Sequence, residues 1–376
     1  MYVTGVGRTK FGALDKSLPE LMYEAMFNSI DDCDLKVEDL DAVYVANFIS
    51  GPLVGQLHLN SLVSHLLQGF RKPCIRVETA CASGGAAFYQ ALLSLSKFET
   101  IMVVGVEKMS SSNPKETTRA LAMAGDRVLD YKEGLVFPAN YALVAQQHMM
   151  RYGTTHDDLS LVSLKNHKNA NLNPLAHFFQ QEVDLETIKK SKIVCSPFNV
   201  FDCCPISDGA AAVIVSRNKK TNRDIEVIGS ALAVDSLSLS QREDITSFEA
   251  VKIAARDAYE QSKVSPKDLD IAEVHDCFTI AELVAMEDLG ICKPGESKDL
   301  IRKRKTEMNG DLPINTDGGL IGDGHPIGCS GIAQVVEVVT QLRGEAGKRQ
   351  VDGVRIGLTH NVGGVGGTAV VHIFRG

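Results

Sequence analysis

An internal repeat is the feature of this 376-residue sequence that most constrains its fold. Residues 38–50 align with residues 267–279 at an offset of 229 (267 − 38), and both stretches have the pattern of a helix exit followed by a short strand. Residues 78–93 match residues 324–339 in the same way, each being a glycine-containing turn that runs into an amphipathic helix. Because such self-similarity marks a duplicated structural unit, the chain is expected to use one unit twice.

Strand patterns extend the repeat over both halves of the chain. Buried-strand patterns at residues 101–106 and 354–359 follow the two helices, and each half closes on a further apolar strand, at 209–215 and 367–374. Strands that alternate with helices predict an α/β fold. We therefore expect an α-β-α-β-α layered fold made of two pseudo-duplicated halves, with the chemistry where loops of both halves meet.

The two halves differ by roughly a hundred extra residues in the first one, which favours an inserted loop domain. This comparison divides the chain into four predicted segments. They are a core half at 1–108, the inserted loop domain at 109–204, the last strand of the first half at 205–222, and the second core half at 223–376.

Charge and cysteine content exclude several classes of protein. The formal net charge is −8 and no basic stripe is interleaved with aromatic residues, so no nucleic-acid partner is expected. No run of about eighteen apolar residues is present, so no membrane span is expected. The nine cysteines are scattered without metal-ligand spacing, and no signal peptide begins the chain. This pattern favours a reducing cytoplasm and no bound metal.

Two of four candidate loops offer a cysteine as a reactive group. In the first loop Cys81 stands before a helix of small and apolar residues, where helix-end amides are expected to lower the pKa of its thiol. In the second, His275 and Cys277 follow a predicted strand, at the edge where α/β proteins collect functional residues. Taken alone, either loop also fits a purely structural role.

The other two loops are rich in glycine. His325 lies next to a proline in a glycine-containing turn before a helix, which would fix the direction of its imidazole. His360 and Asn361 begin a glycine cluster between two buried strands, where backbone amides can point at an oxyanion. A phosphate-binding loop is disfavoured because the Gly-Lys-Ser/Thr ending is missing. A structural turn or hairpin remains the alternative for each loop.

Together, in this order and on a duplicated frame, the four loops resemble those of the thiolase superfamily, in its sterol-carrier-protein-2 type. The resemblance covers essentially the whole chain. The better-known thiolases have Asn-Glu-Ala-Phe in the second loop and Cys-x-Gly in the fourth, and this chain has neither. The matching motifs are Cys-Ala-Ser-Gly at 81–84, His-Asp-Cys-Phe at 275–278, Gly-His-Pro at 324–326 and His-Asn-Val-Gly-Gly at 360–364.

The resemblance implies an α/β thiolase-like fold and an acyltransferase that performs CoA-dependent cleavage of 3-ketoacyl-CoA or the reverse Claisen condensation. It implies that Cys81 is the acyl-carrying nucleophile, that His325 activates it, and that Cys277 is the acid/base in place of a second catalytic cysteine in the fourth loop. It further implies that His275 and His325 bind the enolate oxygen and that the backbone amides of Cys81 and Gly363 bind the acyl oxygen.

Further expectations follow from the same resemblance. His360 and Asn361 would support the site, and Asn361 stands where the better-known enzymes have their second cysteine. Coenzyme A would be a co-substrate, with no tightly bound cofactor, and the loop domain would cover its pantetheine arm; no individual CoA-binding residue is predicted. The chain is expected to be cytoplasmic and to form a homodimer or a dimer of dimers, and an accessory subunit is an open alternative.

Three other functions fit parts of the same pattern. A decarboxylating ketoacyl synthase or 3-hydroxy-3-methylglutaryl-CoA synthase would share the frame, although Cys277 argues against both. An aldolase-like enzyme of the same fold would not need the acyl-accepting Cys81. A non-catalytic acyl-CoA- or lipid-binding protein would bind thioesters without turnover.

Overall fold

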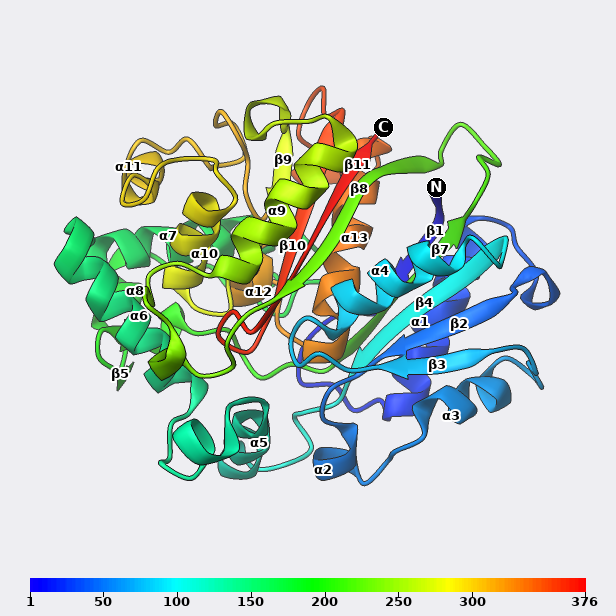
Figure 1. Cartoon of the computed structure of the whole chain (residues 1–376), viewed down its shortest axis with the longest axis horizontal. Coiled ribbons are helices and arrows are strands. Elements are labelled where there is room, and N and C mark those ends of the chain that lie inside the picture. Colours follow the sequence, from blue (N-terminus) through cyan, green and yellow to red (C-terminus); the bar gives the residue numbers. More distant parts are fainter.

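The computed structural model describes all residues 1–376 and contains one nine-stranded mixed sheet, in the order β3-β2-β4-β7-β1-β8-β11-β10-β9 (Figure 1). The first half supplies β1 (Tyr2–Arg8), β2 (Ala42–Ala46), β3 (Cys74–Val77), β4 (Thr100–Glu107) and β7 (Gly209–Ser216). The second half supplies β8 (Ile225–Val234), β9 (Ile271–Glu273), β10 (Ile356–Gly363) and β11 (Thr368–Arg375).

The order of the strands confirms the predicted duplication. From the centre outward, the first half has β1, β7, β4 and β2, and the second half has their counterparts β8, β11, β10 and β9. The segments aligned at the offset of 229 contain β2 and β9. Strand β2 runs parallel to β4, and β9 runs parallel to β10, the counterpart of β4. The two halves join in the middle, where Val3 of β1 pairs with Ile225 of β8.

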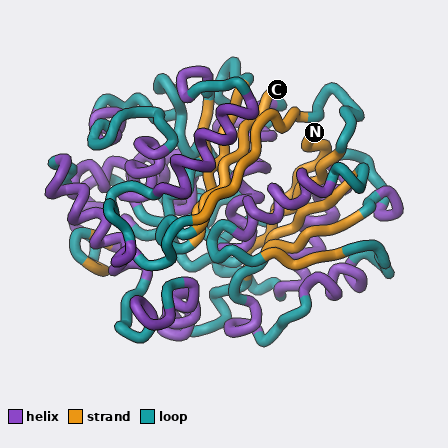
Figure 2. The backbone as a smooth tube through the Cα atoms, viewed as in Figure 1, coloured by secondary structure: helices purple, strands orange, loops and turns teal.

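Helices cover the sheet in the predicted layers (Figure 2). The first half contributes α1 (Leu18–Asp32), α2 (Ser50–Val54), α3 (Leu59–Leu66) and α4 (Ser83–Ser94). The second contributes α9 (Glu249–Ser262), α10 (Thr279–Asp288), α11 (Ser297–Arg302), α12 (Gly319–Gly322) and α13 (Ile327–Leu342). The counterparts α4 and α13 pack on each other and on strands of both halves, while α1 packs on β1, β4 and β7 and α9 on β8 and β11. The strands of the two halves, joined through β1 and β8, thus lie on either side of a central layer made of α4 and α13, with α1 and α9 outside them, which confirms the expected α-β-α-β-α architecture.

Local sequence explains where these elements begin. At the start of α1, the backbone N–H of Ser17 donates to Glu20 in a capping box, at 2.7 Å. Strand β4, Thr-Ile-Met-Val-Val-Gly-Val-Glu, is buried at every position and rich in β-branched residues, as a central strand covered on both faces requires.

Glycines allow the N-terminal ends of α4 and α13 to touch. A Cβ added to Gly84 would lie 2.9 Å from the backbone nitrogen of Gly331. A Cβ on Gly331 would lie 2.2 Å from Asn361 Oδ1 and 2.5 Å from the nitrogen of Gly85. Since no real Cβ fits at such distances, only glycine permits this approach. The contact brings the loop before α4 next to the loop before α13.

Between β4 and β7 the chain leaves the sheet for four helices and a small hairpin. They are α5 (Pro114–Leu121), α6 (Phe137–Tyr152), α7 (His156–Ala170), α8 (Leu185–Lys190), β5 (Ile193–Cys195) and β6 (Phe198–Asn199). These elements fall within residues 109–204, and the division of the chain into the four segments stays a prediction. None of the helices in the chain has the length and apolar character needed to cross a membrane.

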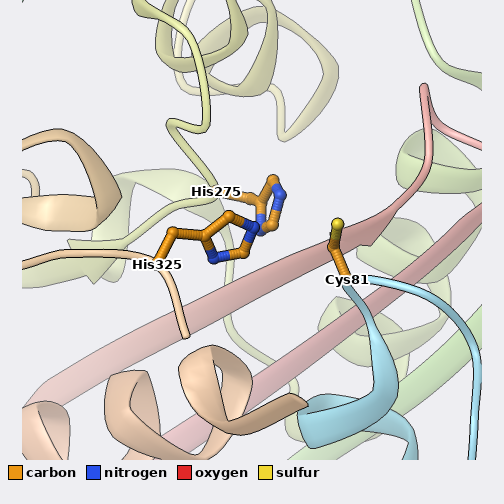
Figure 3. A group of neighbouring side chains, drawn as sticks. All are labelled: Cys81, His275 and His325. Carbon is orange, nitrogen blue, oxygen red and sulfur yellow. The ribbon is translucent and has the colours of Figure 1, made fainter. Parts of the chain in front are cut away.

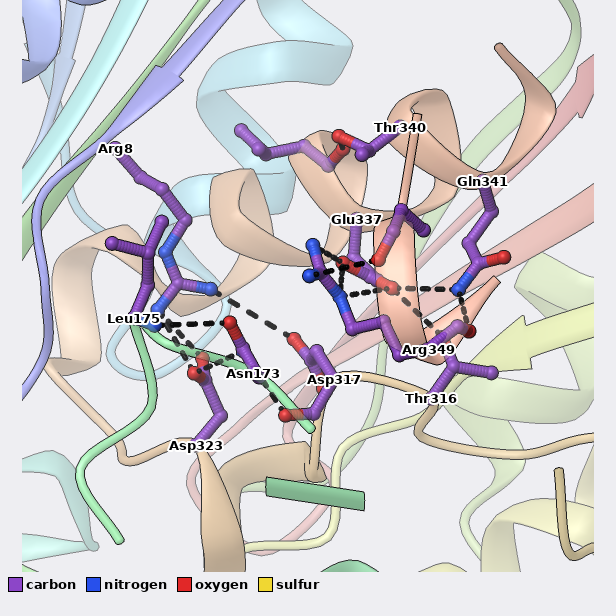
Figure 4. A network of polar contacts seen from close by, with 12 residues as sticks. Arg8, Asn173, Leu175, Thr316, Asp317, Asp323, Glu337, Thr340, Gln341 and Arg349 are labelled. Atoms are coloured by element: carbon purple, nitrogen blue, oxygen red, sulfur yellow. Dashed lines mark hydrogen bonds and ion pairs between the residues drawn. The ribbon is translucent and has the colours of Figure 1, made fainter. Parts of the chain in front are cut away.

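A buried network of charged groups ties the first strand to the second half of the chain (Figure 4). Arg8, at the end of β1, donates to both carboxylate oxygens of Asp323, at 2.8 and 3.0 Å. Asn173 donates to the same carboxylate at 3.0 Å. Because Asp323 immediately precedes the Gly-His-Pro turn, this network fixes the segment that carries His325.

Candidate active site

Three of the predicted site residues meet in one place. The Cys81 sulfur and a ring nitrogen from each of His275 and His325 lie within 4.8 Å of one another. Figure 3 shows the side chains reaching this point from three separate segments: the turn before α4, the loop after β9 and the turn before α13. The two imidazole rings stand nearly perpendicular, with centroids 5.2 Å apart. The loops of both halves therefore meet, as the duplicated fold predicts.

A strained turn presents Cys81. The preceding Ala80 has a φ of 51°, in the left-handed region that a residue with a Cβ seldom adopts. The Ser83 hydroxyl holds this turn by accepting from the N–H of Thr79 at 3.0 Å and donating to the carbonyl of Ala80 at 2.6 Å. The turn directs the Cys81 side chain away from the helix axis and toward the two histidines.

The ionisation state of Cys81 differs from the sequence prediction. Burial raises the pKa of its thiol to about 12, and hydrogen bonds from backbone amides, Gly364 first among them, lower it only in part. The expected net lowering by the helix end is therefore wrong, because desolvation of a thiolate outweighs the neighbouring amides. The Cys81 thiol therefore keeps its proton at neutral pH and would need a base in order to act as a nucleophile.

His325 is placed to be that base. Its Nδ1 lies 2.7 Å from the Ser330 hydroxyl, which also contacts the carbonyl of Pro326 at 3.1 Å. If Ser330 gives its single hydrogen to Pro326, it accepts from His325 Nδ1–H, and Nε2 is left with a free lone pair. That Nε2 is buried and has no partner. Burial lowers the pKa of His325 to about 3, so the ring is neutral.

His275 faces the same space with a second unpartnered Nε2. Burial, with smaller contributions from His325 and His360, lowers its pKa well below the usual value. Its Nδ1 lies 3.2 Å from Asn361 Nδ2, and its backbone N–H donates to His360 Nδ1 at 3.3 Å. The two residues predicted to support the site, which lie in β10 and not in a loop, thus contact His275 directly, although His360 lies outside the three-residue cluster.

Cys277 lies in a more apolar part of the site. Burial raises the pKa of its thiol well above the usual value, and the nearby Tyr141 hydroxyl lowers it in part. The Tyr141 hydroxyl donates its single hydrogen to the Gly364 carbonyl, at 3.1 Å. Because Cys277 keeps its proton at neutral pH, it has the state required of a proton donor.

Sequence reasoning missed two residues of the site, Ser330 and Tyr141. Ser330 follows His325 by five positions, one helical turn into α13, so the motif could have suggested it. Tyr141 comes from α6 in the inserted segment, and nothing local marks it. The backbone amides that face the Cys81 sulfur belong to Cys81 and Gly364. Gly363 as the second oxyanion donor stays a prediction.

A basic groove lies on the inserted segment. Lys115 and Arg119 of α5 line it together with Tyr131 and Lys132. The opposite face of α5 presents Ala120 to a small apolar cluster that includes Cys81. The groove offers several cations to a polyphosphate. Helix α5 lies between this groove and Cys81.

Comparison with known families agrees with this geometry. Residues 1–219 match the family model described as "Thiolase, N-terminal domain", and residues 231–376 match "Thiolase C-terminal domain-like". The chain belongs to the thiolase family. This membership confirms the resemblance drawn from the four motifs. It also confirms the prediction that the chain is an acyltransferase of the thiolase type.

Individual thiolase relatives span the whole chain. An acetyl-CoA acetyltransferase of Methanothermobacter thermautotrophicus is 44% identical over 379 residues, which cover 99% of this chain and 98% of the relative. Human sterol carrier protein 2 is 34% identical over 397 residues, covering 100% of this chain and 72% of that protein.

Solved structures of thiolase-like proteins show the same fold. The structure named "Ltp2-ChsH2(DUF35) aldolase" has a TM-score of 0.86 and 25% identity, and covers 99% of this chain and 97% of that one. Human mitochondrial 3-ketoacyl-CoA thiolase has a TM-score of 0.74 and 18% identity, with coverage of 100% and 98%.

Proposed function

We propose that this thiolase-family chain cleaves 3-ketoacyl-CoA with coenzyme A, and in reverse condenses an acyl-CoA with acetyl-CoA, through an acyl group carried on Cys81. The observation that carries the proposal is the buried convergence of the Cys81 thiol with unpartnered nitrogens of His275 and His325. Acyl transfer needs a nucleophile, a base and an oxyanion donor around one carbon. The name acetyl-CoA acetyltransferase of the 44% identical relative supports the same reaction.

In the first half-reaction, His325 Nε2 takes the thiol proton as the Cys81 sulfur attacks the 3-keto carbon. The bond between C2 and C3 breaks, and the enolate of acetyl-CoA leaves. His275 and the protonated His325 donate hydrogen bonds to the enolate oxygen while Cys277 gives its proton to C2. The products are acetyl-CoA and acyl-Cys81, with Cys277 left as a thiolate and His325 as an imidazolium.

In the second half-reaction, the Cys277 thiolate takes the thiol proton of free coenzyme A. The resulting CoA thiolate attacks the acyl carbon, whose oxygen is bound by the backbone amides of Cys81 and, as predicted from the family, Gly363. The bond to Cys81 breaks and its sulfur recovers the proton from His325. Both residues return to their starting states, and acyl-CoA leaves.

Coenzyme A is proposed as a co-substrate held by the inserted segment. Its phosphates would lie in the basic groove of Lys115, Arg119 and Lys132, and its pantetheine arm would pass α5 to reach Cys81. A thiolase structure solved "in complex with CoA" shares the fold, with a TM-score of 0.73. A cytoplasmic location stays a prediction.

Intact-mass analysis after brief exposure to acetyl-CoA or acetoacetyl-CoA tests the acyl-enzyme. One acetyl group is expected on the wild-type protein and none on Cys81→Ala. A Cys277→Ala protein is the matched control: it should still accept an acetyl group from acetyl-CoA, although more slowly than wild type, because coenzyme A can leave as a thiolate without the proton that Cys277 would give it. Retention of the adduct in Cys81→Ala would contradict the proposed nucleophile.

An aldolase-like activity is the second candidate, because the aldolase structure has a TM-score of 0.86. Carbon–carbon cleavage that survives in Cys81→Ala, with release of an aldehyde or ketone, would favour it. That structure also pairs two named proteins, so full thiolytic activity of the purified chain is the measurement that separates an independent enzyme from one that requires an accessory subunit.

A further inference from the structure

The Asn361 amide has a fixed orientation, and this orientation determines which nitrogen of His275 carries the ring proton. Asn361 Oδ1 lies 3.1 Å from the backbone nitrogen of Gly85, which can only donate. The atom facing Gly85 must therefore be the oxygen, and the amide NH₂ must face the other way, toward His275.

The close helix contact locks this orientation. Asn361 lies where Cβ atoms on Gly85 or Gly331 would clash, 3.2 Å and 2.2 Å from its Oδ1. Asn361 is only 2% exposed, so its side-chain amide has no room to rotate and exchange the positions of its oxygen and nitrogen. The polarity that it presents to His275 is set by the fold.

His275 must accept from that amide. Its Nδ1 lies 3.2 Å from Asn361 Nδ2, so Nδ1 carries the lone pair and the single ring proton resides on Nε2. The opposite tautomer would place two donors against each other in a buried site, which costs a hydrogen bond and leaves both donors unsatisfied. His275 therefore points an N–H at the space that it shares with Cys81 and His325.

The same three side chains have the composition of a metal site. One sulfur and two imidazole nitrogens within 4.8 Å suit a Zn²⁺ or Co²⁺ ion with an open position. A metal would need the lone pair of His275 Nε2. Histidine ligands in metal sites carry a proton on the other ring nitrogen and donate it to a carboxylate or carbonyl. Asn361 offers that nitrogen a donor where a metal site requires an acceptor.

We propose that Asn361 is a positioning residue: by donating to His275 Nδ1 it keeps Nε2 a hydrogen-bond donor, so that the Cys81–His275–His325 cluster binds an oxyanion and not a transition metal. This inference rests on the proposed function for the oxyanion part. The choice of tautomer and the rejection of metal rest on the hydrogen bonds alone.

Asn361→Asp is the decisive variant. It has nearly the same shape and keeps an acceptor for Gly85, but it replaces the donor toward His275 with a second acceptor. The His275 proton should move to Nδ1 and free Nε2 for a metal. At about pH 8 the metal can displace the proton of the Cys81 thiol. The variant should then bind one equivalent of Co²⁺ at least ten- to a hundredfold more tightly than wild type.

The readout is optical. A Cys81 thiolate bound to Co²⁺ gives a near-ultraviolet charge-transfer band, which should appear in Asn361→Asp and vanish in Asn361→Asp with Cys81→Ser. Asn361→Leu is the matched control of similar size; it removes the donor and adds no acceptor, so it should gain less affinity than the Asp variant. In metal-free buffer both single variants should lose about a hundredfold in kcat with little change in KM.

A second measurement covers the case in which the variants fail to fold. In wild-type protein labelled with ¹⁵N-histidine, the resonances of His275, assigned by their loss in His275→Gln, should show a proton on Nε2. A proton on Nδ1 would overturn the proposal. So would Co²⁺ binding to wild type as tight as to a folded Asn361→Asp, or a folded Asp variant with wild-type kcat and no charge-transfer band.

These results separate the inference from the proposed function. Failure of wild type to become acetylated on Cys81 would refute the thiolase reaction, whereas the tautomer and the Co²⁺ band would still decide the role of Asn361.

Discussion

At the scale of single residues, the site works from a neutral resting state. Burial raises the pKa of Cys81 to about 12 and lowers that of His325 to about 3. Between these values the pair is a thiol beside a free base, without a thiolate or an imidazolium. In the proposed reaction the thiol proton therefore has to move to His325 while the sulfur attacks the substrate.

This state predicts an unusual dependence of acylation on pH. A histidine with an ordinary pKa would take up a proton as the pH falls through about 6.5 and lose its function as a base. Because the pKa of His325 is lowered, the base form persists to much lower pH. The rate of Cys81 acetylation at low acetyl-CoA, followed by intact mass, should therefore stay level between about pH 8 and pH 5. A tenfold fall between about pH 6.5 and pH 5.5 would instead indicate that His325 has an ordinary pKa.

At the scale of elements, the contact between α4 and α13 creates the site. Gly331→Ala should lower the free energy of unfolding by about 1–3 kcal/mol, because its methyl group would meet Asn361 and Gly85 with no room to relax. The measurement is urea denaturation. Activity should fall as well, since the same methyl group displaces Asn361.

Thr340→Ala, near the other end of α13, is the control for that substitution. Thr340 donates to the carbonyl of Val336 within its own helix and is only partly buried, so its loss should change stability by less than about 0.5 kcal/mol. Equal stability of the Gly331→Ala and wild-type proteins would show that the two helices can move apart.

Sequence predicted the elements well because their signals are local. The offset that aligned residues 38–50 with 267–279 located β2 and β9, and the apolar runs located β4, β7, β10 and β11. The candidate loop of His360 and Asn361 is an exception, since both residues lie inside β10, where the pairing with β11 continues to Gly363. The glycines that follow Asn361 favoured a loop, and only the pairing with β11 shows where β10 ends.

The parts of the site that depend on contacts between distant residues could not be predicted from the sequence. The bond from Gly85 to Asn361 joins positions 276 apart, and that from Asn361 to His275 joins positions 86 apart. The pKa of Cys81 was mispredicted for the same reason: the amides are local, but the burial that outweighs them comes from packing against α5 and other segments.

At the scale of the whole molecule, the two edges of the sheet are not equivalent. Edge strand β9 is covered by residues 313–315: Ala272 donates to the carbonyl of Pro313, and Asn315 donates to the carbonyl of Ala272. Edge strand β3 ends the sheet on the other side, and its Ile75 is 52% exposed. An open edge with an apolar side chain favours pairing with a second chain.

We expect the predicted homodimer to form through β3. Ile75→Lys should then convert the protein to a monomer in light scattering, since the substitution buries a charge in the interface. Ile193→Lys, at a site that is 65% exposed on β5, is the matched control and should leave the dimer intact. A monomeric wild-type protein would refute the expectation.

The buried pairing of Arg8 with Asp323 has a consequence for how the chain is made. The two residues are 315 positions apart. At a synthesis rate of roughly 5–20 residues per second, the ribosome needs roughly 15–60 s between them. During that time β1 can pair with β7, but the Arg8 guanidinium lacks Asp317 and Asp323, the carboxylates with which it is buried. We therefore expect the end of β1 that carries Arg8 to become buried only after translation has passed the segment that carries His325.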